Sequence, residues 1–410
     1  NIDSHDNTVY MKEIVLAALD GFTCLGSRCP DNCCAHPWQV PVDPDTYEKW
    51  SSMEAGPERD RLLASLDISE KNGTKLIRIK QDTGDRCPHL TTDMLCGLQV
   101  RHGGDFLSDV CRTYPRIRTA NTVRTFSSAS LSCPEIARLV LFPTSAEPVF
   151  RQTTATGSDV ERAAVMSDPI AYYFDNFTRE VLDQTKYPLR VRIVFIAHQL
   201  MRLAKESDEG KLTAQSLQQM YRTLRDGLYE TNRAIKSSQL RPDPLVAGAF
   251  WNAVYGVSRQ LFDSTIGAVG STELLESLRS NDAVAEEKYR TIYEAMLRAR
   301  EAARPALTDH APAFERYFAA LLMNHGFPWN PSTGNHVATF ISAIFPFATT
   351  WLSLWLLAAS GKQIGRGDII TAVYRADRTL THSDKIPNLL DRKRDALRLD
   401  TYYHCLVHLG

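Results

Sequence analysis

The sequence predicts a mainly α-helical protein, in which a small, irregular, cysteine-rich N-terminal domain with short strands precedes a large all-helical domain. Three observations support this fold class. Eight of the nine cysteines lie between residues 24 and 133. Apolar residues recur at helical spacing almost without a break from about residue 168 onward. Segments that alternate apolar and polar residues, as half-buried strands do, are few, so a mainly parallel sheet is not expected.

The expected domain boundaries follow changes in composition. Residues 11–142 form the cysteine-rich domain, the Ser-, Thr- and Ala-rich residues 143–167 form a linker, and residues 168–410 form the helical domain. Residues 1–10 are polar and lack the apolar core of a signal peptide. We expect them to be a remnant foreign to the natural chain, or to lack fixed structure, with Met11 as the native start.

Composition is that of an ordinary soluble protein, with 43% hydrophobic residues, 23% charged residues and a formal net charge of −1. So small a net charge creates no field that would attract nucleic acid or an anionic membrane. We therefore expect a protein whose partners are neither nucleic acids nor membranes.

The cysteine-rich domain is expected to hold short elements. DPDTYEKW, residues 43–50, begins a helix for which Asp45 is the expected N-cap, and the helical pattern continues through LLASL at 62–66. KLIRIK, residues 75–80, alternates apolar and polar side chains and predicts a strand. Two further helices are expected at 106–114, before Pro115, and at 132–142.

The C-terminal part is expected to be helical throughout. Segments with a clear 3.6-residue apolar period are 169–182, 189–205, 212–228, 245–262 and 287–301. Residues 337–360 carry no charge over a length that could span a membrane. Because this stretch lies between ordinary soluble helices, we interpret it as a fully buried central helix interrupted near Pro346, with a membrane span as the alternative. GKQIGRGD, 361–368, is interpreted as a helix C-terminus and turn.

The clustered cysteines are the clearest chemical signal. Thiols clustered in a long chain without a signal peptide bind metal more often than they form disulfides. The paired C-x2-C knuckles of structural zinc sites are absent, and loose spacing with an adjacent Cys-Cys pair favours an iron–sulfur cluster. Some of these cysteines could instead be buried apolar thiols or a disulfide, and a second metal or a redox-active pair stays open, since eight thiols exceed the need of one cluster. The candidate metal ligands are Cys24, Cys29, Cys33, Cys34, Cys87, Cys96, Cys111 and Cys133.

Other polar residues near these cysteines receive weaker assignments. His36, His89 and His102 are interpreted as surface or supporting residues rather than ligands. His325 and His382 lie at expected helix ends, where a capping role is favoured over catalysis. No G-x-G-x-x-G follows a strand, so no standard dinucleotide-binding fold is indicated. The cysteine spacing also differs from the C-x3-C-x2-C of ordinary radical S-adenosylmethionine enzymes.

Several longer runs resemble one protein family. FTCLGSRCPDNCCAHPWQVPVD, CPHLTTDMLCGLQVRHGGDFLSDVCRTYPRI and LSCPEIARLVL resemble the flagellin lysine N-methylases, part of a wider cysteine-cluster group with a C-x-x-x-C-x-x-x-C-C type motif. FERYFAALLMNHGFPW (314–329) and IGRGDIITAVYRADRTLTHS (364–383) resemble the helical half of the same family. The resemblance therefore covers most of the chain from about residue 11.

The resemblance implies a cytoplasmic enzyme that transfers a methyl group from S-adenosylmethionine to lysine side chains of flagellin. It also implies a [4Fe–4S] cluster on N-terminal cysteines, among which Cys33 and Cys111 are the strongest ligand candidates. One iron without a protein ligand could hold the methionine end of S-adenosylmethionine. The alternative from another class is a non-enzymatic metal-cluster protein, such as a redox sensor or a metal-binding module.

Methyl transfer would require a neutral lysine amine, although free lysine has a pKa near 10.4. CRTYPRIR, residues 111–118, offers the best polar groups beside the cysteines. We assign Tyr114 and Arg116 as candidate catalytic residues and Arg112 and Trp38 as candidate cofactor-binding residues. The alternatives are that the arginines, Arg118 included, support cluster sulfurs and helix ends, and that Trp38 and Trp329 are core residues.

Overall fold

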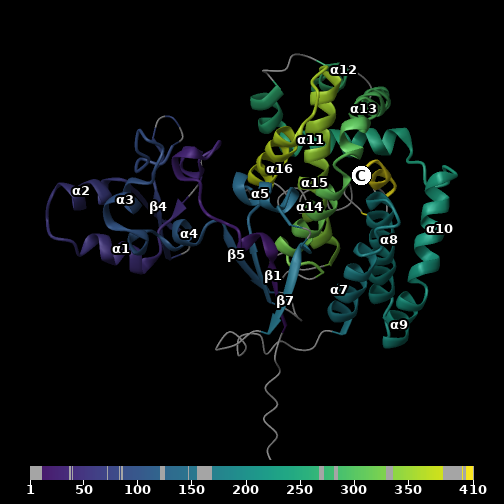
Figure 1. Cartoon of the computed structure of the whole chain (residues 1–410), viewed down its shortest axis with the longest axis horizontal. Coiled ribbons are helices and arrows are strands. Elements are labelled where there is room, and N and C mark those ends of the chain that lie inside the picture. Colours follow the sequence, from purple (N-terminus) through teal and green to yellow (C-terminus); the bar gives the residue numbers. More distant parts are fainter. Residues whose placement is uncertain are drawn as a thin grey trace, which may run out of the picture.

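The computed structural model shows a small lobe beside a large helical body (Figure 1). This mainly α-helical architecture confirms the predicted fold class. Described residues are 12–36, 38, 40–71, 73–82, 84, 86–120, 125–145, 147–154, 169–266, 272–280, 285–328, 336–381, 399 and 403–409. Trp329 and His382 lie outside the described residues, as do residues 1–11 and the larger part of the predicted linker.

The small lobe is built from short elements around its own core. Its antiparallel sheet has the order β2-β4-β3, with β2 at Val40–Pro41, β3 at Leu66–Lys71 and β4 at Thr74–Ile79. The strand predicted at 75–80 is therefore confirmed. Its helices are α1 (Pro44–Ser51), α2 (Pro57–Ala64), α3 (Gly97–His102) and α4 (Asp109–Thr113). The core contains Val42, Trp50, Leu62, Leu66, Ile79, Leu98 and Leu107.

Local chemistry shifts two of the predicted helix boundaries. The N-cap of α1 is Asp43 rather than Asp45, because Asp43 Oδ1 accepts the Thr46 N–H at 2.9 Å while Pro44 occupies the first helical position. The apolar pattern that continued to 62–66 belongs to a second helix, α2, which begins directly after Gly56. Near the end of the lobe, the helix predicted at 106–114 is confined to α4, after a 3₁₀ turn at Gly104–Phe106.

A second sheet joins the small lobe to the helical body. Its order is β5-β6-β1-β7, with β1 and β6 parallel and the two outer pairs antiparallel. Ile14 and Phe126 of this sheet and Ile136 of the following helix belong to the same hydrophobic cluster as the helical body. The elements are β1 (Lys12–Leu16), β5 (Arg116–Ala120), β6 (Thr125–Ala129), α5 (Pro134–Leu141) and β7 (Phe150–Thr154).

The hydrophobic cores are therefore not separated at the predicted boundary at residue 142. The small core takes in residues 42–107, whereas β1 and the stretch from β6 to α5 pack into the large core. Strand β7 also lies within the stretch 143–167 that was expected to be a linker. The cause is β1: it pairs with β6 on one side and β7 on the other, which ties both strands to the helical body.

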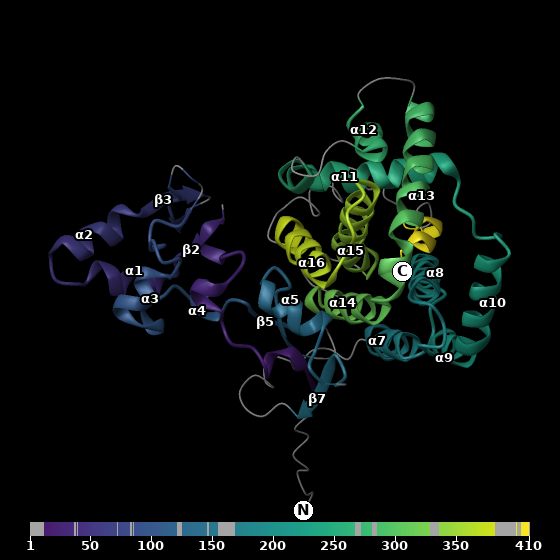
Figure 2. The same cartoon turned by 45° about the horizontal axis from the view of Figure 1, so that its top comes forward.

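The helical body is arranged around α15 (His336–Ala359), which is flanked in both views by α11, α13, α14 and α16 (Figures 1 and 2). The helix predicted over 212–228 breaks at Thr223, which separates α9 from α10. The other helices are α7 (Pro169–Leu182), α8 (Leu189–Asp208), α9 (Ala214–Arg222), α10 (Leu224–Lys236), α11 (Pro244–Ile266), α12 (Glu273–Arg279), α13 (Ala285–Thr308), α14 (Ala311–Asn324) and α16 (Arg366–Thr381).

Helix α15 is the uncharged segment of the sequence. Among the described helices it is the one long and apolar enough to cross a membrane, but 94% of its most apolar window is buried inside the fold. This burial supports the interpretation as a central core helix. The expected interruption at Pro346 is wrong, because the helix continues through it. Thr350 Oγ1 donates to the Pro346 carbonyl at 3.0 Å, one helical turn after the proline.

Candidate functional site

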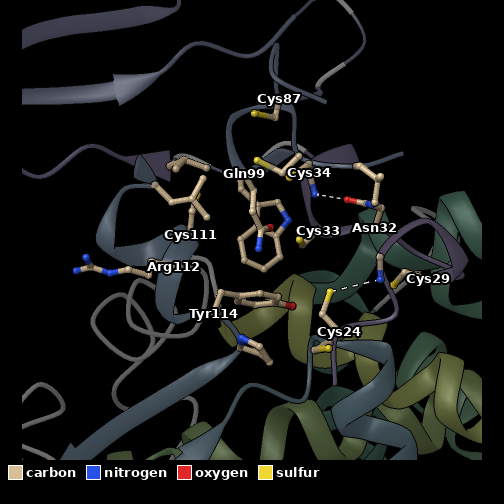
Figure 3. Close-up of a pocket in the computed structure, with 18 of the residues that line it drawn as sticks. Cys24, Cys29, Asn32, Cys33, Cys34, Cys87, Gln99, Cys111, Arg112 and Tyr114 are labelled. Carbon is tan, nitrogen blue, oxygen red and sulfur yellow. Dashed lines mark hydrogen bonds between the residues drawn. The ribbon is translucent and has the colours of Figure 1, made fainter. Parts of the chain in front are cut away.

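All eight N-terminal cysteines line one cavity of about 500 Å³ (Figure 3). They come from four separate stretches: the segment 24–34, the loop that leads into α3, helix α4, and the residue before α5. The ninth cysteine, Cys405, is buried in the large core near the C-terminus. The pattern of clustered cysteines in the sequence thus corresponds to one place in the fold.

Local structure explains how the adjacent pair Cys33 and Cys34 is held. Asn32 caps the short 3₁₀ turn at Cys33–Ala35, since its Oδ1 accepts the Cys34 N–H at 2.8 Å. The Asn32 Nδ2 group also donates to the Met94 carbonyl at 2.7 Å, which fastens this turn to the loop before α3. Gly97 allows that loop to close, because a Cβ there would lie 2.9 Å from the His89 carbonyl oxygen.

Cys34 is the centre of an inner thiol group. Its thiol lies beside the thiols of Cys33, Cys87 and Cys96, and the Cys87 N–H donates to the Cys34 carbonyl at 2.9 Å. Interaction with Cys34 lowers the pKa of Cys33 to about 7 and that of Cys96 to about 6, and the same interactions raise the pKa of Cys34. Cys111 faces the same group, and burial raises its pKa to about 11.

Cys24, Cys29 and Cys133 form an outer group across the cavity. Figure 3 shows Cys24 and Cys29 on the side away from Cys87. Burial raises the pKa of Cys29, and it raises that of Cys133 to about 11. The Gly26 N–H donates to Cys24 Sγ at 3.5 Å.

The residues present fit a thiolate-bound metal group by their chemistry. Four thiols, including that of Cys34, lie together in the cavity wall, and a metal would take the place of their protons. Within the described ranges, no three His, Cys, Asp or Glu side chains are arranged as a ready-made site for a single ion. The eight cysteines therefore stay candidate ligands, gathered at one cavity, and Cys33 and Cys111 both line it.

The three histidines near the cysteines make contacts of the kind expected for supporting residues. His89 is buried, its Nε2 lies 3.0 Å from Ser65 Oγ, and burial lowers its pKa to about 4. His102 Nε2 lies 2.9 Å from Glu58 Oε1 on the small lobe. His36 pairs with Asp31 and contacts Arg378, far away in the sequence.

Trp38, Arg112, Tyr114 and Arg116, the candidate catalytic and cofactor-binding residues, also line the cavity. The rings of Trp38 and Tyr114 meet edge to face, with centroids 5.3 Å apart, and burial raises the pKa of the Tyr114 phenol. The Arg116 guanidinium lies over the Phe22 ring at 5.4 Å. Their predicted roles remain predictions, but the structure does place these four residues in the wall of the cavity that the cysteines line.

Two of the arginines are directed elsewhere. The Arg112 guanidinium pairs with Asp109 and points away from the cysteines in Figure 3. Arg118 does not line the cavity but pairs with Glu13 of β1 at 3.7 Å. The supporting role that the sequence left open fits these two side chains better than ligand binding.

Helix α16 supplies residues that the sequence did not single out. Arg378 Nη1 lies 2.9 Å from Asp31 Oδ1, and its Nη2 donates to the Ser132 carbonyl at 3.0 Å. Burial by itself would raise the pKa of Asp31, but hydrogen bonding to His36 and the charge of Arg378 outweigh it and lower that pKa to about 2. Arg378 therefore ties two cysteine-bearing segments to the helical body. Nothing local in ADRT, residues 376–379, signals this role.

His325 is the C-cap residue of α14 and is partly buried, in agreement with its predicted position at a helix end. Its backbone N–H donates to the Leu321 carbonyl at 3.1 Å. Trp38 and Tyr114, the thiols and the α16 residues all lie where the small lobe joins the helical body.

Comparison with known proteins gives consistent matches. Residues 175–407 match the family described as FliB lysine N-methylase C-terminal domain. The flagellar biosynthetic protein FliU of Salmonella muenchen is 31% identical over 135 residues, which is 32% of this chain and 79% of that protein. Proteins named lysine-N-methylase from Salmonella typhimurium and Salmonella choleraesuis are 31% identical over 135 residues, which is 33% of each. No solved structure matches.

Proposed function

The chain belongs to the FliB lysine N-methylase family, and from this premise we propose that it is a protein-lysine N-methyltransferase. The methyl donor would be S-adenosylmethionine, the substrate lysine side chains of flagellin in the cytoplasm, and the N-terminal cysteines would hold an iron–sulfur cluster. The curated lysine-N-methylases are matched over about a third of their length, so activity and substrate are proposals for this chain.

One observation carries the proposal beyond family membership. The eight thiols and the Trp38–Tyr114 pair line a single cavity, and α16 of the matched domain contacts the segments that form it. Aromatic faces attract cations such as the sulfonium of the methyl donor and the ammonium of lysine. A site that binds both cations needs aromatic side chains in its wall, and it also needs a group that removes a proton from the lysine ammonium.

When bound, an iron–sulfur cluster with one iron free of cysteine would supply an open position for the methionine end of S-adenosylmethionine. The protein's own residues would do the rest. Three of the four thiols of Cys33, Cys34, Cys87 and Cys96 would suffice to hold it, because these thiols lie together around Cys34. Trp38 and Tyr114 would orient the cations and narrow the access of water.

The test uses protein purified without oxygen, S-adenosylmethionine and unmethylated flagellin, with intact mass as the readout. We expect mass increments of one methyl group, together with bound iron and sulfide. Cys34→Ser should lose iron, whereas Cys405→Ala, a matched change of a buried cysteine outside the cavity, should keep it. Iron without methyl transfer would favour the non-enzymatic metal-cluster alternative. Stoichiometric zinc in place of iron would contradict the cluster.

A further inference from the structure

Asp377 of α16 is a carboxylate buried beside the cysteine segment. It is 1% exposed, and two hydroxyl groups donate to it: Ser130 Oγ to Oδ2 at 3.1 Å and Thr381 Oγ1 to Oδ1 at 2.8 Å. Burial of an ionised carboxylate is costly unless hydrogen bonds or charges compensate it. The hydrogen-bond partners of this carboxylate show which part of the fold it is connected to.

A series of hydrogen-bonded hydroxyl groups, called the hydroxyl file below, connects Asp377 to the cavity. From the carboxylate it passes through Ser130 Oγ to Ser132 Oγ, which lies 2.6 Å away, and then to Tyr114 Oη at 3.1 Å. Both serines are almost wholly buried, at 1% and 0% exposure, whereas Tyr114 lines the cavity. The file therefore runs from the cavity wall into the helical body.

The carboxylate sets the direction of every bond in the file. The Ser130 hydroxyl donates to Asp377, and a serine has only one hydroxyl hydrogen, so that hydrogen is used in this bond. Ser130 Oγ can then only accept from Ser132, as it also does from the Ser132 N–H at 3.3 Å. By the same reasoning Ser132 accepts from Tyr114. The Tyr114 hydroxyl hydrogen is thus committed to the file, and its lone pairs are left to accept from the cavity.

We propose that this file removes the proton that the substrate lysine must lose, with Tyr114 as the group that contacts the ammonium and Asp377 as the final acceptor. The inference deepens the proposed function and rests on it. Free lysine at pH 7 is less than about 0.1% neutral, so a methyltransferase needs such a route. Asp377 acts through the serines and is a positioning and proton-accepting residue rather than one that touches substrate.

The proton balance closes within the protein. The ammonium N–H bond breaks as its proton passes to Tyr114 Oη, while the protons of Tyr114, Ser132 and Ser130 each move one oxygen further toward Asp377. Ammonium and carboxylate become amine and carboxylic acid. The amine lone pair then forms the N–C bond as the methyl C–S bond breaks with its electrons going to sulfur. The proton returns by the same path to water when the product leaves.

The Asp377 carboxylate is not needed merely to anchor the segment 130–133. The neighbouring Arg378 already fastens that segment, since its Nη2 donates to the Ser132 carbonyl. The Ser130 N–H is likewise held, because it donates to the Pro115 carbonyl at 2.7 Å. A neutral side chain at 377 would leave both contacts in place, which is why the two roles can be separated by substitution.

The experiment measures kcat and KM for Tyr114→Phe, Ser130→Ala and Asp377→Asn with flagellin. Each should lower kcat on the order of 100-fold with little change in KM, as expected for loss of general base assistance. Ser128→Ala is the matched control, since this buried serine of β6, two residues before Ser130, bonds to Asn324 outside the file. Iron content and thermal unfolding identify a variant that fails to fold, and Tyr114→Phe and Ser130→Ala then decide the result.

A second substrate separates proton removal from a structural role. In flagellin whose accepting lysines are replaced by aminoethylated cysteine, the ammonium is more acidic, so the three variants should lose a smaller factor than with lysine. Equal losses with both substrates would overturn the relay, as would variants that turn over like the parent protein. If the parent protein itself transfers no methyl group, the proposed function fails and the relay with it.

Discussion

Two glycines of α11 should respond in opposite ways to alanine substitution. Gly248 lies where α11 crosses α13, and a Cβ there would be 1.9 Å from the Tyr289 carbonyl oxygen. Gly256 is on the same helix, and a Cβ there would meet nothing within 4 Å. Replacement by alanine adds the same methyl group to the same helix in both cases, so any difference must come from packing.

The magnitude follows from the geometry. A Cβ essentially never comes closer than 3.0 Å, so Gly248→Ala requires α11 and α13 to separate by about 1.1 Å at the crossing. Separation by this much forfeits roughly a quarter to a half of the dispersion energy between facing atoms. Because the obstacle is backbone, we expect a cost of about 3 kcal/mol, the upper end of the usual range for overpacking. The better helix propensity of alanine returns about 1 kcal/mol. The net destabilisation is then about 2 kcal/mol.

The assay is equilibrium unfolding in urea, followed by helical circular dichroism. Gly248→Ala should shift the midpoint to lower urea at an unchanged slope, whereas Gly256→Ala should be up to about 1 kcal/mol more stable than the parent chain. Equal midpoints for the two variants would refute the packing argument. So would a stabilised Gly248→Ala, since it would mean that α11 and α13 do not approach as closely as the structure shows.

Three further predictions concern the site and the C-terminus. Cys33→Ser and Cys111→Ser should lose iron and lower the first thermal transition, because the small lobe has a small core and metal–thiolate bonds would contribute to its folding; chelation of the parent protein should do the same, and an unchanged first transition would contradict it. Arg378→Met should destabilise the junction by about 3 kcal/mol, because it leaves the Asp31 carboxylate largely buried without a positive partner. Faster hydrogen exchange in the cysteine segment would report this loss, and unchanged exchange would contradict it. Burial and the charge of Arg300 lower the pKa of His408 to about 3. Below about pH 6.5 the unfolded chain binds a proton at this histidine and the folded chain does not. The free energy of unfolding should therefore fall by roughly 1.4 kcal/mol per pH unit from about pH 6.5 down to about pH 3. His408→Leu should flatten that part of the stability profile, and a profile like that of the parent chain would count against this assignment.

Much of the fold was predictable because it depends on local patterns. The helices at 169–182 and 189–205 appear as α7 and α8, since an apolar period of 3.6 residues is a property of one helix and its nearest neighbours. The helix predicted at 132–142 appears as α5 for the same reason, with Pro134 in its first turn. Errors arose where two local signals compete: Asp43 rather than Asp45 caps α1, and Pro346 does not break α15 because the surrounding core holds it.

Part of the candidate site was also predictable from local sequence, and part was not. Cysteine spacing was sufficient to indicate a shared role, and the structure gathers all eight thiols at one cavity. Spacing could not indicate that Cys34 contacts Cys33, Cys87 and Cys96, or that Asp377 reaches Ser130 across 247 residues. Gly248 and Gly256 likewise look alike in the sequence, and only the crossing of α11 with α13 distinguishes them.

The sequence by itself therefore determined most of the helical segments, which residues carry the clustered thiols and to which family the chain belongs. Tertiary structure decided which thiols meet, which aromatic rings face them and which charges of α16 join them. The physical reason is the range of the interactions. Helix periodicity and capping act over a few residues, so the local sequence specifies them. Contacts between distant residues depend on how every intervening element packs, and packing is a property of the whole chain.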